Sequence, residues 1–326
     1  MRDYAAYLMP EPLQSPPCSL RDFLPAAVFA NSRAGRGRAA KAFPRIRAYF
    51  EQQRIPLEFH EPDSIDQLHS SCQNVIAGGC RALIAVGGDG TVQALAQNAL
   101  GRNVSVGIIP AGGGNDFASA LGIPRDPLAA AHGLMNPETK LVDVALAKTA
   151  DGRERIYLGG GGIGLDAEAA KYAATHYNRW PGRIRYILSA LHAFREFPPM
   201  RVQVETSDIR PPIHDVPLHV ANVLNTPTYG AGLRFAPKAR IDDGLLNVTL
   251  LEELNIARIL RLLPGLLLGG KIKTDRAMRF STTHIRLTPD RLCTFHGDGE
   301  LFGPAPVEIS VLPKALSVLV PRTHPS

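Results

Sequence analysis

The chain has 326 residues, of which 45% are hydrophobic and 20% are charged. This length suits about two domains, and this apolar content excludes a wholly disordered protein. The 36 Lys and Arg residues exceed the 30 Asp and Glu residues by six, an excess too small for a dedicated nucleic-acid binder. We therefore expect no nucleic-acid partner, and rather a protein that handles phosphates or touches an anionic membrane surface.

Cysteine spacing and apolar runs limit the class of protein further. The four cysteines form no C-x-x-C pair, which excludes a zinc knuckle or a thioredoxin-type motif and favours free thiols in a reducing cytosol. There is no apolar run of about 18 residues, the length that would span a bilayer. Residues 1–24 read as a Pro-rich extension and lack the pattern of a secretory signal. We expect a cytoplasmic protein.

In the first half of the chain, short apolar runs alternate with segments of helical spacing. Strands are predicted at Ala26–Ala30, Arg81–Val86 and Val104–Ile109. Helices are predicted at 37–53, Thr91–Leu100 and Asn115–Leu121. Repeated strand–helix units favour a doubly wound parallel sheet.

The second half of the chain is dominated by period-two alternation. Strands are predicted at Met200–Glu205, Leu218–Asn222, Leu246–Leu250, Thr283–Leu287 and Val307–Val311. Helices are predicted at Arg183–Phe197 and Ile256–Leu268. Short strands separated by polar turns are typical of an antiparallel β-sandwich. A polar stretch near Lys148–Arg155 marks the domain boundary, so the sandwich is assigned to residues 148–313.

Three glycine-rich loops each follow a predicted strand of the first half. They are Asn31–Arg38, Gly87–Thr91 and Pro110–Phe117. All three lie at the carboxyl ends of parallel strands, the edge where open α/β sheets bind ligands. Glycines let backbone amides approach a phosphate chain closely, and the helix that follows offers its positive end. Asp89 could help to hold Mg²⁺ or accept a proton, so the loops together predict a Mg²⁺–nucleotide site.

Two further glycine patterns are poor candidates. Gly159-x-Gly161-x-x-Gly164 matches the dinucleotide fingerprint, but no acid follows about 20 residues later. Gly265-x₄-Gly270-Lys271 nearly matches a phosphate-binding P-loop, but Ile272 stands where Ser or Thr is required. We assign no nucleotide to either.

Taken together, these motifs resemble the diacylglycerol kinase catalytic superfamily, which includes sphingosine and ceramide kinases and bacterial soluble lipid kinases. The GGDGT loop alone is shared with NAD kinases, but five further segments narrow the resemblance. All six segments, in chain order, are Asn31…Gly35-x-Gly37, Gly87–Thr91, Asn115–Ala118, Gly164–Ala167, Asp242–Leu246 and Asp298–Glu300. Their order and spacing fit from about residue 25 to residue 322.

The resemblance implies an NAD-kinase/diacylglycerol-kinase-like α/β domain at 25–147, to which the last strand, in 314–326, returns. In this family ATP binds in the cleft between the two domains, and its γ-phosphate passes to a hydroxyl of a lipid such as diacylglycerol or a sphingoid base. The partner implied is a lipid at a membrane surface, with peripheral membrane association; a homodimer is left open. An NAD kinase, and a nucleotide-binding regulator without catalysis, are the alternatives.

The resemblance also implies roles for individual residues. Those that would bind the nucleotide are Asn31, Gly35, Gly87, Gly88, Asp89, Gly90, Thr91, Gly112 and Gly113. Glu300 would be the general base that takes the proton of the lipid hydroxyl, with Asp89 as the second catalytic residue. Asp166, in the segment that matches the family's G-F-D-A, would face the substrate.

Two sets of residues would hold Mg²⁺ by the same resemblance. Asp116 and Asp143 match acids that hold an active-site Mg²⁺ and water network in a bacterial member. The segment with Arg240, Asp243 and Leu245 matches a structural Mg²⁺ site in which two ligands are backbone carbonyls. The cofactors implied are therefore ATP and Mg²⁺.

The sequence departs from the family pattern at two positions and leaves the membrane contact open. Gly113 stands where the third loop usually has Thr, and Gln93 replaces a usual Asn, which motivates the regulator alternative. The basic run Arg33–Lys41 is either a solvated helix face or a contact to phosphates or anionic headgroups. Ile256–Leu268, and Trp180 with its neighbouring arginines, are candidates for membrane contact or for ordinary packing.

Overall fold

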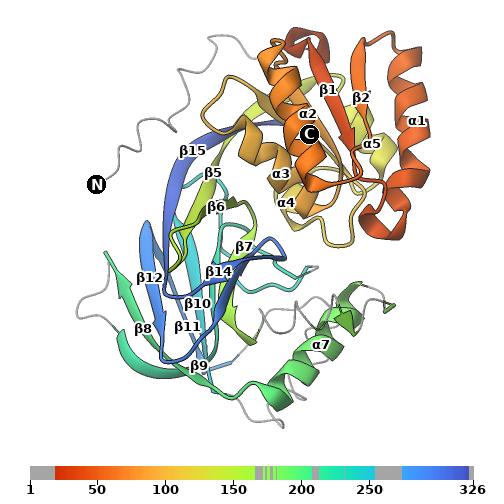
Figure 1. Ribbon diagram of the computed structural model, residues 1–326. Helices are drawn as coiled ribbons and strands as arrows, with labels where there is room; N and C mark the ends of the chain where they lie inside the picture. The colour runs from red at the N-terminus through yellow and green to blue at the C-terminus, as the bar shows by residue number, and fades with distance from the viewer. Residues whose placement is uncertain are drawn as a thin grey trace. The chain divides into compact units, whose positions relative to one another are not determined.

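The computed structural model describes residues 19–165, 172, 175–176, 179–180, 182–207, 213–230, 232–253 and 274–322. The chain forms two compact units (Figure 1): unit 1 comprises Met1–Val142 and Lys314–Ser326, and unit 2 comprises Asp143–Pro313. The first division falls between Val142 and Asp143, not after residue 147 as the composition suggested. It lies inside one continuous strand, β5 (Pro137–Lys148), so no change of composition marks it.

Unit 1 is built on a parallel sheet with the strand order β2-β1-β3-β4. Its strands are β1 (Ala26–Ala30), β2 (Leu57–His60), β3 (Ala82–Gly87) and β4 (Ser105–Pro110), with the end of β15 (Val307–Pro321) parallel to β4. Its helices are η2 (Leu20–Phe23), η3 (Ala34–Arg36), α1 (Arg38–Gln52), α2 (Ile65–Ala77), α3 (Asp89–Ala99), α4 (Asp116–Ala120) and α5 (Pro127–Gly133). Each residue of β1, β3 and β4 is buried, because helices cover both faces of a parallel sheet.

The connections of unit 1 make the sheet doubly wound, as predicted. The chain leaves β1 through α1 to β2, then returns past β1 through α2 to β3 and onward through α3 to β4. Because such crossovers are right-handed, α1 lies on one face of the sheet and α2 and α3 lie on the other. Accordingly α2 packs against α3, and α1 against α5 (Figure 1). The winding reverses between β1 and β3, which makes their carboxyl ends the expected ligand edge.

Unit 2 is an antiparallel β-sandwich, again as predicted. It contains the end of β5, the start of β15 and one described helix, α7 (Gly182–Glu196). Its other strands are β6 (Glu154–Tyr157), β7 (Gly160–Gly164), β8 (Met200–Thr206), β9 (Ile213–Leu224), β10 (Leu246–Glu252), β11 (Ala277–Thr282), β12 (His284–Pro289), β13 (Thr294–Gly297) and β14 (Glu300–Pro304).

Strand β9 links the two layers of the sandwich. Its first half pairs with β8, and β8 continues to β12 and β15, whereas its second half pairs with β7 and β10. Side chains from both layers share one core, in which Val202 and Leu287 of the first layer are buried with Val223 and Val248 of the second. The glycine fingerprint at 159–164 therefore forms the central strand β7, not a phosphate loop.

Several expectations fall on residues that the structure does not describe. These are Asp166 and the Ile256–Leu268 helix, which stay predictions, and the Gly265–Lys271 pattern, whose rejection as a phosphate loop is untested. Trp180 is described, and its side chain is half exposed. Among the described residues, none of the helices has the length and apolar composition that crossing a membrane would need.

Candidate nucleotide and acceptor sites

The three glycine loops of unit 1 meet at the carboxyl edge of its sheet. Loop one follows β1, loop two follows β3 and loop three follows β4, so the first two flank the point where the winding reverses. The second loop is shorter than the sequence suggested, because α3 already begins at Asp89. Gly90 and Thr91 therefore lie in the first turn of α3, the end of a helix that favours an anion. The Thr91 amide already donates to the Gly88 carbonyl at 3.0 Å.

Contacts between the loops require glycine at two places. Gly88 and Gly112 face each other so closely that a Cβ on Gly112 would collide with the Cα of Gly88 and lie 2.7 Å from Asn115 Oδ1. Gly35 has a φ of +59°, and a Cβ there would collide with the carbonyl oxygen of Ala111. Side chains at these positions would push the loops apart, so the glycines keep the backbone amides at one edge.

Polar side chains join the loops as well. The amide of Asn31 donates to Thr91 Oγ1 at 3.4 Å, which links loop one to α3. Arg38 donates through Nε to the Gly35 carbonyl at 3.2 Å and through its guanidinium to the Gly112 carbonyl. Arg38 thus clamps loop one to loop three, a role that neither interpretation of the basic run had anticipated.

Asp89 connects the second loop to the third. Its carboxylate accepts hydrogen bonds from the backbone amides of Asn115 at 2.9 Å and Phe117 at 3.2 Å. These amides belong to the N-terminus of α4, whose own N-cap residue Asn115 makes no side-chain cap hydrogen bond. Asp89 therefore caps a neighbouring helix, and its carboxylate keeps acceptor capacity for a further ligand.

Burial raises the pKa of Asp89 to about 6, and the nearby carboxylate of Asp116 adds to the rise. The amides of Phe117, Asp116 and Asn115 act in the opposite direction because they favour the charged form. Asp116 itself is buried, and it lies close enough to Asp89 for the two carboxylates to repel each other. A cation shared between them would relieve the unfavourable proximity of two carboxylates.

The pKa of Asp89 predicts a pH dependence of stability in the metal-free protein. Since this pKa rises from 3.8 to about 6 on folding, the folded chain binds the proton more tightly than the unfolded chain. The unfolding free energy of the wild type relative to Asp89→Asn should therefore fall by about 2–3 kcal/mol as the pH rises from about 4 to about 7. Denaturant titrations of both proteins in EDTA measure this difference, and a rise over that range would contradict the assignment.

Gly113 has a different environment from Gly112. No atom lies within 4 Å of the place that its Cβ would occupy. Its backbone is also outside the left-handed region that favours glycine, unlike that of Asn115 with a φ of +56°. The position is therefore open to a side chain, and the glycine there is not required by packing.

In unit 2, Asp298 fixes the turn of the D-G-E segment. Its carboxylate accepts three backbone amides, from Leu158 at 2.7 Å, Gly159 at 2.9 Å and Gly160 at 3.2 Å. Asp298 itself has a φ of +50°, so the turn between β13 and β14 adopts a conformation that needs such support. The sequence predicted the turn, but not this anchor.

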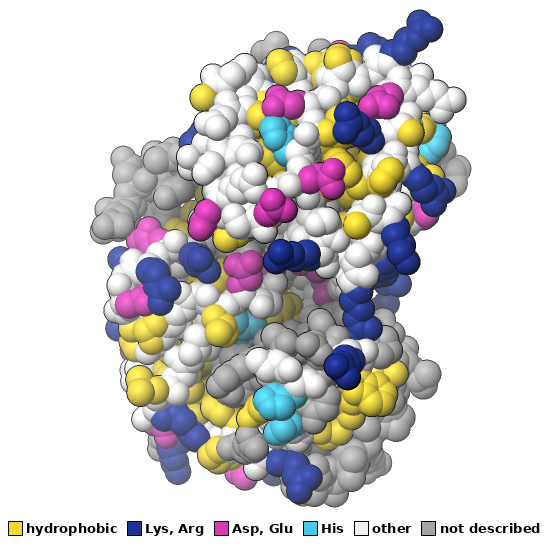
Figure 2. Space-filling model, turned by 45° about the vertical axis from the view of Figure 1, so that its right-hand side comes forward, with side chains coloured by type: hydrophobic (Ala, Val, Ile, Leu, Met, Phe, Trp, Pro, Cys, Tyr) yellow, Lys and Arg dark blue, Asp and Glu magenta, His cyan; other side chains and the backbone are white. Residues whose placement is uncertain are grey.

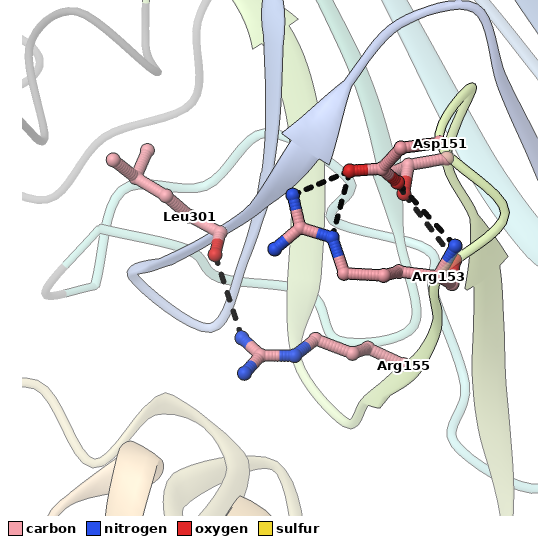
Figure 3. A network of polar contacts seen from close by, with 5 residues as sticks. Asp151, Arg153, Arg155 and Leu301 are labelled. Carbon is pink, nitrogen blue, oxygen red and sulfur yellow. Dashed lines mark hydrogen bonds and ion pairs between the residues drawn. The ribbon is translucent and has the colours of Figure 1, made fainter.

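Glu300 follows this turn as the first residue of β14. Its side chain is 45% exposed, and its Oε2 lies 3.8 Å from Arg155 Nη1. Arg155 also donates to the Leu301 carbonyl at 3.4 Å (Figure 3). Its guanidinium lies over the Phe302 ring. Beside it, hydrogen bonds from Arg153 hold the pKa of Asp151 well below its usual range. Glu300 is thus oriented by a neighbouring cation and accessible to a substrate.

The predicted metal ligands of unit 2 do not form a carboxylate cluster. Asp143 is fully buried, and its Oδ2 accepts the Gly244 amide at 2.6 Å, so it anchors the 240–245 segment. Asp243 accepts the Leu245 amide at 3.1 Å within the same turn. Within the described part of the chain, no group of three His, Cys, Asp or Glu side chains could hold a metal. The Mg²⁺ roles of these residues, of Arg240 and of Asp116 stay predictions.

Comparison with known proteins relates this geometry to a family. The family model described as "Diacylglycerol kinase catalytic domain" matches residues 25–147, and the model described as "YegS C-terminal NAD kinase beta sandwich-like domain" matches residues 161–320. A diacylglycerol kinase of Mycobacterium tuberculosis is 31% identical over 90% of this chain and 94% of the relative. The chain belongs to the diacylglycerol kinase family.

Other members of the diacylglycerol kinase family are more distant. A diacylglycerol kinase of Bacillus subtilis is 24% identical over 91% of this chain and 96% of its own length. A crystal structure of a Bacillus anthracis diacylglycerol kinase superposes with a TM-score of 0.66 at 20% identity, covering 92% of this chain and 97% of that one. This structural similarity shows that the two proteins share a fold. The NAD kinase connection is limited to the fold of the second domain.

Proposed function

We propose that the protein is an ATP-dependent lipid kinase that transfers the γ-phosphate of ATP to a hydroxyl of a glycerolipid or a sphingoid lipid. The observation that carries the proposal is the loop cluster of unit 1. Gly88 and Gly112 approach so closely there that a side chain at Gly112 would collide with Gly88, and the N-terminus of α3 is uncapped by any side chain. Such an arrangement of amides suits a chain of phosphates.

The residues of the loop cluster also fit a Mg²⁺ ion bound with the nucleotide. Mg²⁺ in kinases is held by one or two carboxylates together with phosphate oxygens, and Asp89 and Asp116 supply that number. When bound, the ion would neutralise charge on the phosphates. The amides of the loops would hold the phosphates in place, and the clamp from Arg38 would keep loops one and three together.

Glu300 is the proposed general base in this reaction. Its carboxylate would take the proton of the lipid hydroxyl as the oxygen bonds to the γ-phosphorus and the bond to the β-phosphate oxygen breaks, releasing ADP. The support is its place on an exposed turn that Asp298 anchors with three amide contacts, and its match to the family's late D-G-E segment.

A panel of acceptors tests the proposal. Purified protein would be incubated with labelled ATP and Mg²⁺, and with mixed micelles of diacylglycerol, of a sphingoid base or of monoacylglycerol, with NAD⁺ in a separate reaction. We expect one lipid class to become labelled and NAD⁺ to remain unlabelled. Labelling of NAD⁺ alone would support the NAD kinase alternative, and ATP binding without transfer to any acceptor would support the regulator.

Gly113→Thr should improve the use of ATP. The position has open space and an ordinary backbone, so a Thr side chain fits, and its hydroxyl can donate to a phosphate oxygen. One such hydrogen bond is worth about 1 kcal/mol, which corresponds to a roughly fivefold lower KM for ATP. Gly113→Val is the matched control, since it has the same shape without the hydroxyl. Equal KM values for the Thr and Val variants would show that the missing hydroxyl does not matter.

A further inference from the structure

Unit 2 contains a cavity that none of the roles above uses. Its volume is about 480 Å³, and it lies beside β10, β11 and the segment Ala236–Lys238. It shares no lining residue with the loop cluster of unit 1 or with the D-G-E turn. Its polar lining comprises Lys238, Asn247, Thr249, Thr274, Arg279 and Ser281.

The strand register explains why donors gather on this face. β10 and β11 pair in antiparallel fashion, with Asn247 opposite Ser281 and Thr249 opposite Arg279. Directly opposed residues share a face of the sheet, and every second residue returns to it. Between them, Val248 belongs to the core of the sandwich. The two strands thus turn these polar side chains to the cavity, whose lining also includes Val248 and Phe280.

The charge at the cavity is positive. Lys238 and Arg279 are cationic, and the described residues that line the cavity include no acid. Arg279 donates through Nε to the Phe235 carbonyl at 3.3 Å, which holds its guanidinium beside the cavity. In the described part of the structure, Lys238 makes no ion pair, so its charge is available to a ligand.

Asn247 adds an oriented donor. Its Oδ1 accepts the Ser281 hydroxyl at 3.3 Å, and this bond fixes which way the amide faces. Its Nδ2 is buried and meets no hydrogen-bond acceptor among the described residues. A buried N–H without an acceptor is unfavourable, and the cost disappears when a ligand supplies an oxygen.

We propose that this cavity binds a phosphate group, either free or in the headgroup of an anionic lipid. A phosphate offers several acceptor oxygens to donors that converge from different strands, and it can form charge-assisted hydrogen bonds with Lys238 and Arg279. Ala236 and Pro237 give the cavity an apolar side that suits the glycerol part of a headgroup. The inference concerns binding and does not depend on kinase activity.

Binding to two probes tests the site and separates the two sources. Inorganic phosphate would be titrated calorimetrically, and phosphatidylcholine vesicles with and without phosphatidylglycerol would be tested by cosedimentation at low salt. The variants are Lys238→Gln/Arg279→Gln and Asn247→Asp, the latter of which keeps Oδ1 but replaces the donor with a carboxylate oxygen. The control is Arg102→Gln/Arg286→Gln, which removes the same charge at two exposed sites.

The control matters because basic residues are widespread. On the face that Figure 2 shows, Lys and Arg side chains are scattered with Asp and Glu side chains between them.

We expect both cavity variants to weaken binding by about tenfold or more, and the control to change it little. If the cavity variants lose binding to inorganic phosphate only, the site binds free phosphate. If they lose binding to vesicles with phosphatidylglycerol, the site binds a lipid headgroup. Absence of binding by the wild type, or an equal loss in the control, overturns the proposal.

Discussion

Glu300→Gln is expected to lower turnover by about 10²–10⁴-fold while ATP binding changes by no more than a few-fold. Glutamine keeps the size and hydrogen-bonding capacity of the side chain but cannot accept the proton of an alcohol. Glu300 is an exposed residue at the start of β14, so the substitution should leave the fold intact. Kinase rates and ATP affinity, measured on the same preparation, separate the chemical step from nucleotide binding.

The matched control for this prediction is Glu308→Gln. Glu308 is also exposed, with 47% of its side chain accessible, and its carboxylate pairs with His284 at 2.8 Å. It lies in β15 of the same unit and has no role in the proposed chemistry, so its loss should change turnover by less than about twofold. If Glu300→Gln loses ATP binding but keeps turnover per bound nucleotide, then Glu300 contributes to nucleotide binding and not to proton transfer. Asp89 then becomes the candidate base.

Gly112→Ala is expected to destabilise unit 1 and to abolish most nucleotide binding. The added Cβ would collide with the Cα of Gly88 and crowd Asn115 Oδ1, so the second and third loops must separate. Such overpacking costs about 1–3 kcal/mol of unfolding free energy. The loss should also extend to ATP binding, because the amides of both loops are displaced together.

Gly113→Ala is the adjacent control. It adds the same methyl group one residue later, where no atom lies within 4 Å. We expect thermal and chemical unfolding of this variant to match the wild type closely, with unchanged ATP affinity. Equal effects of the two substitutions would mean that the approach of Gly88 and Gly112 is not what shapes the site.

The parts of the fold that sequence predicted are those with strong local signals. β1, β3 and β4 are short apolar runs whose residues are all buried, and each ends at a polar or glycine-rich loop. β2 and α2 went unpredicted, because no residue of β2 is fully buried and α2 buries few apolar residues. The strand β7 also went unpredicted, because four of its five residues are glycines and only its pairing with β9 and β13 makes it a strand.

The site was predicted in its residues but not in its contacts. Parallel strands end at one edge, so the meeting of the three glycine loops follows from their order in the chain. The clamp from Arg38 to Gly112, the capping of α4 by Asp89 and the three amides at Asp298 join residues far apart in sequence. Such pairings depend on register and loop conformation, which composition and spacing do not encode.

The most direct test of the account is the fate of labelled phosphate. The wild type would be given ATP labelled at the γ-phosphate or at the α-phosphate, with lipid micelles and Mg²⁺, and label in the organic phase would be counted. We predict labelled lipid from γ-labelled ATP alone, and a loss of that label in Glu300→Gln with ATP binding retained. No lipid labelling across glycerolipid and sphingoid acceptors, or label from the α-position, would contradict the assignment as a lipid kinase.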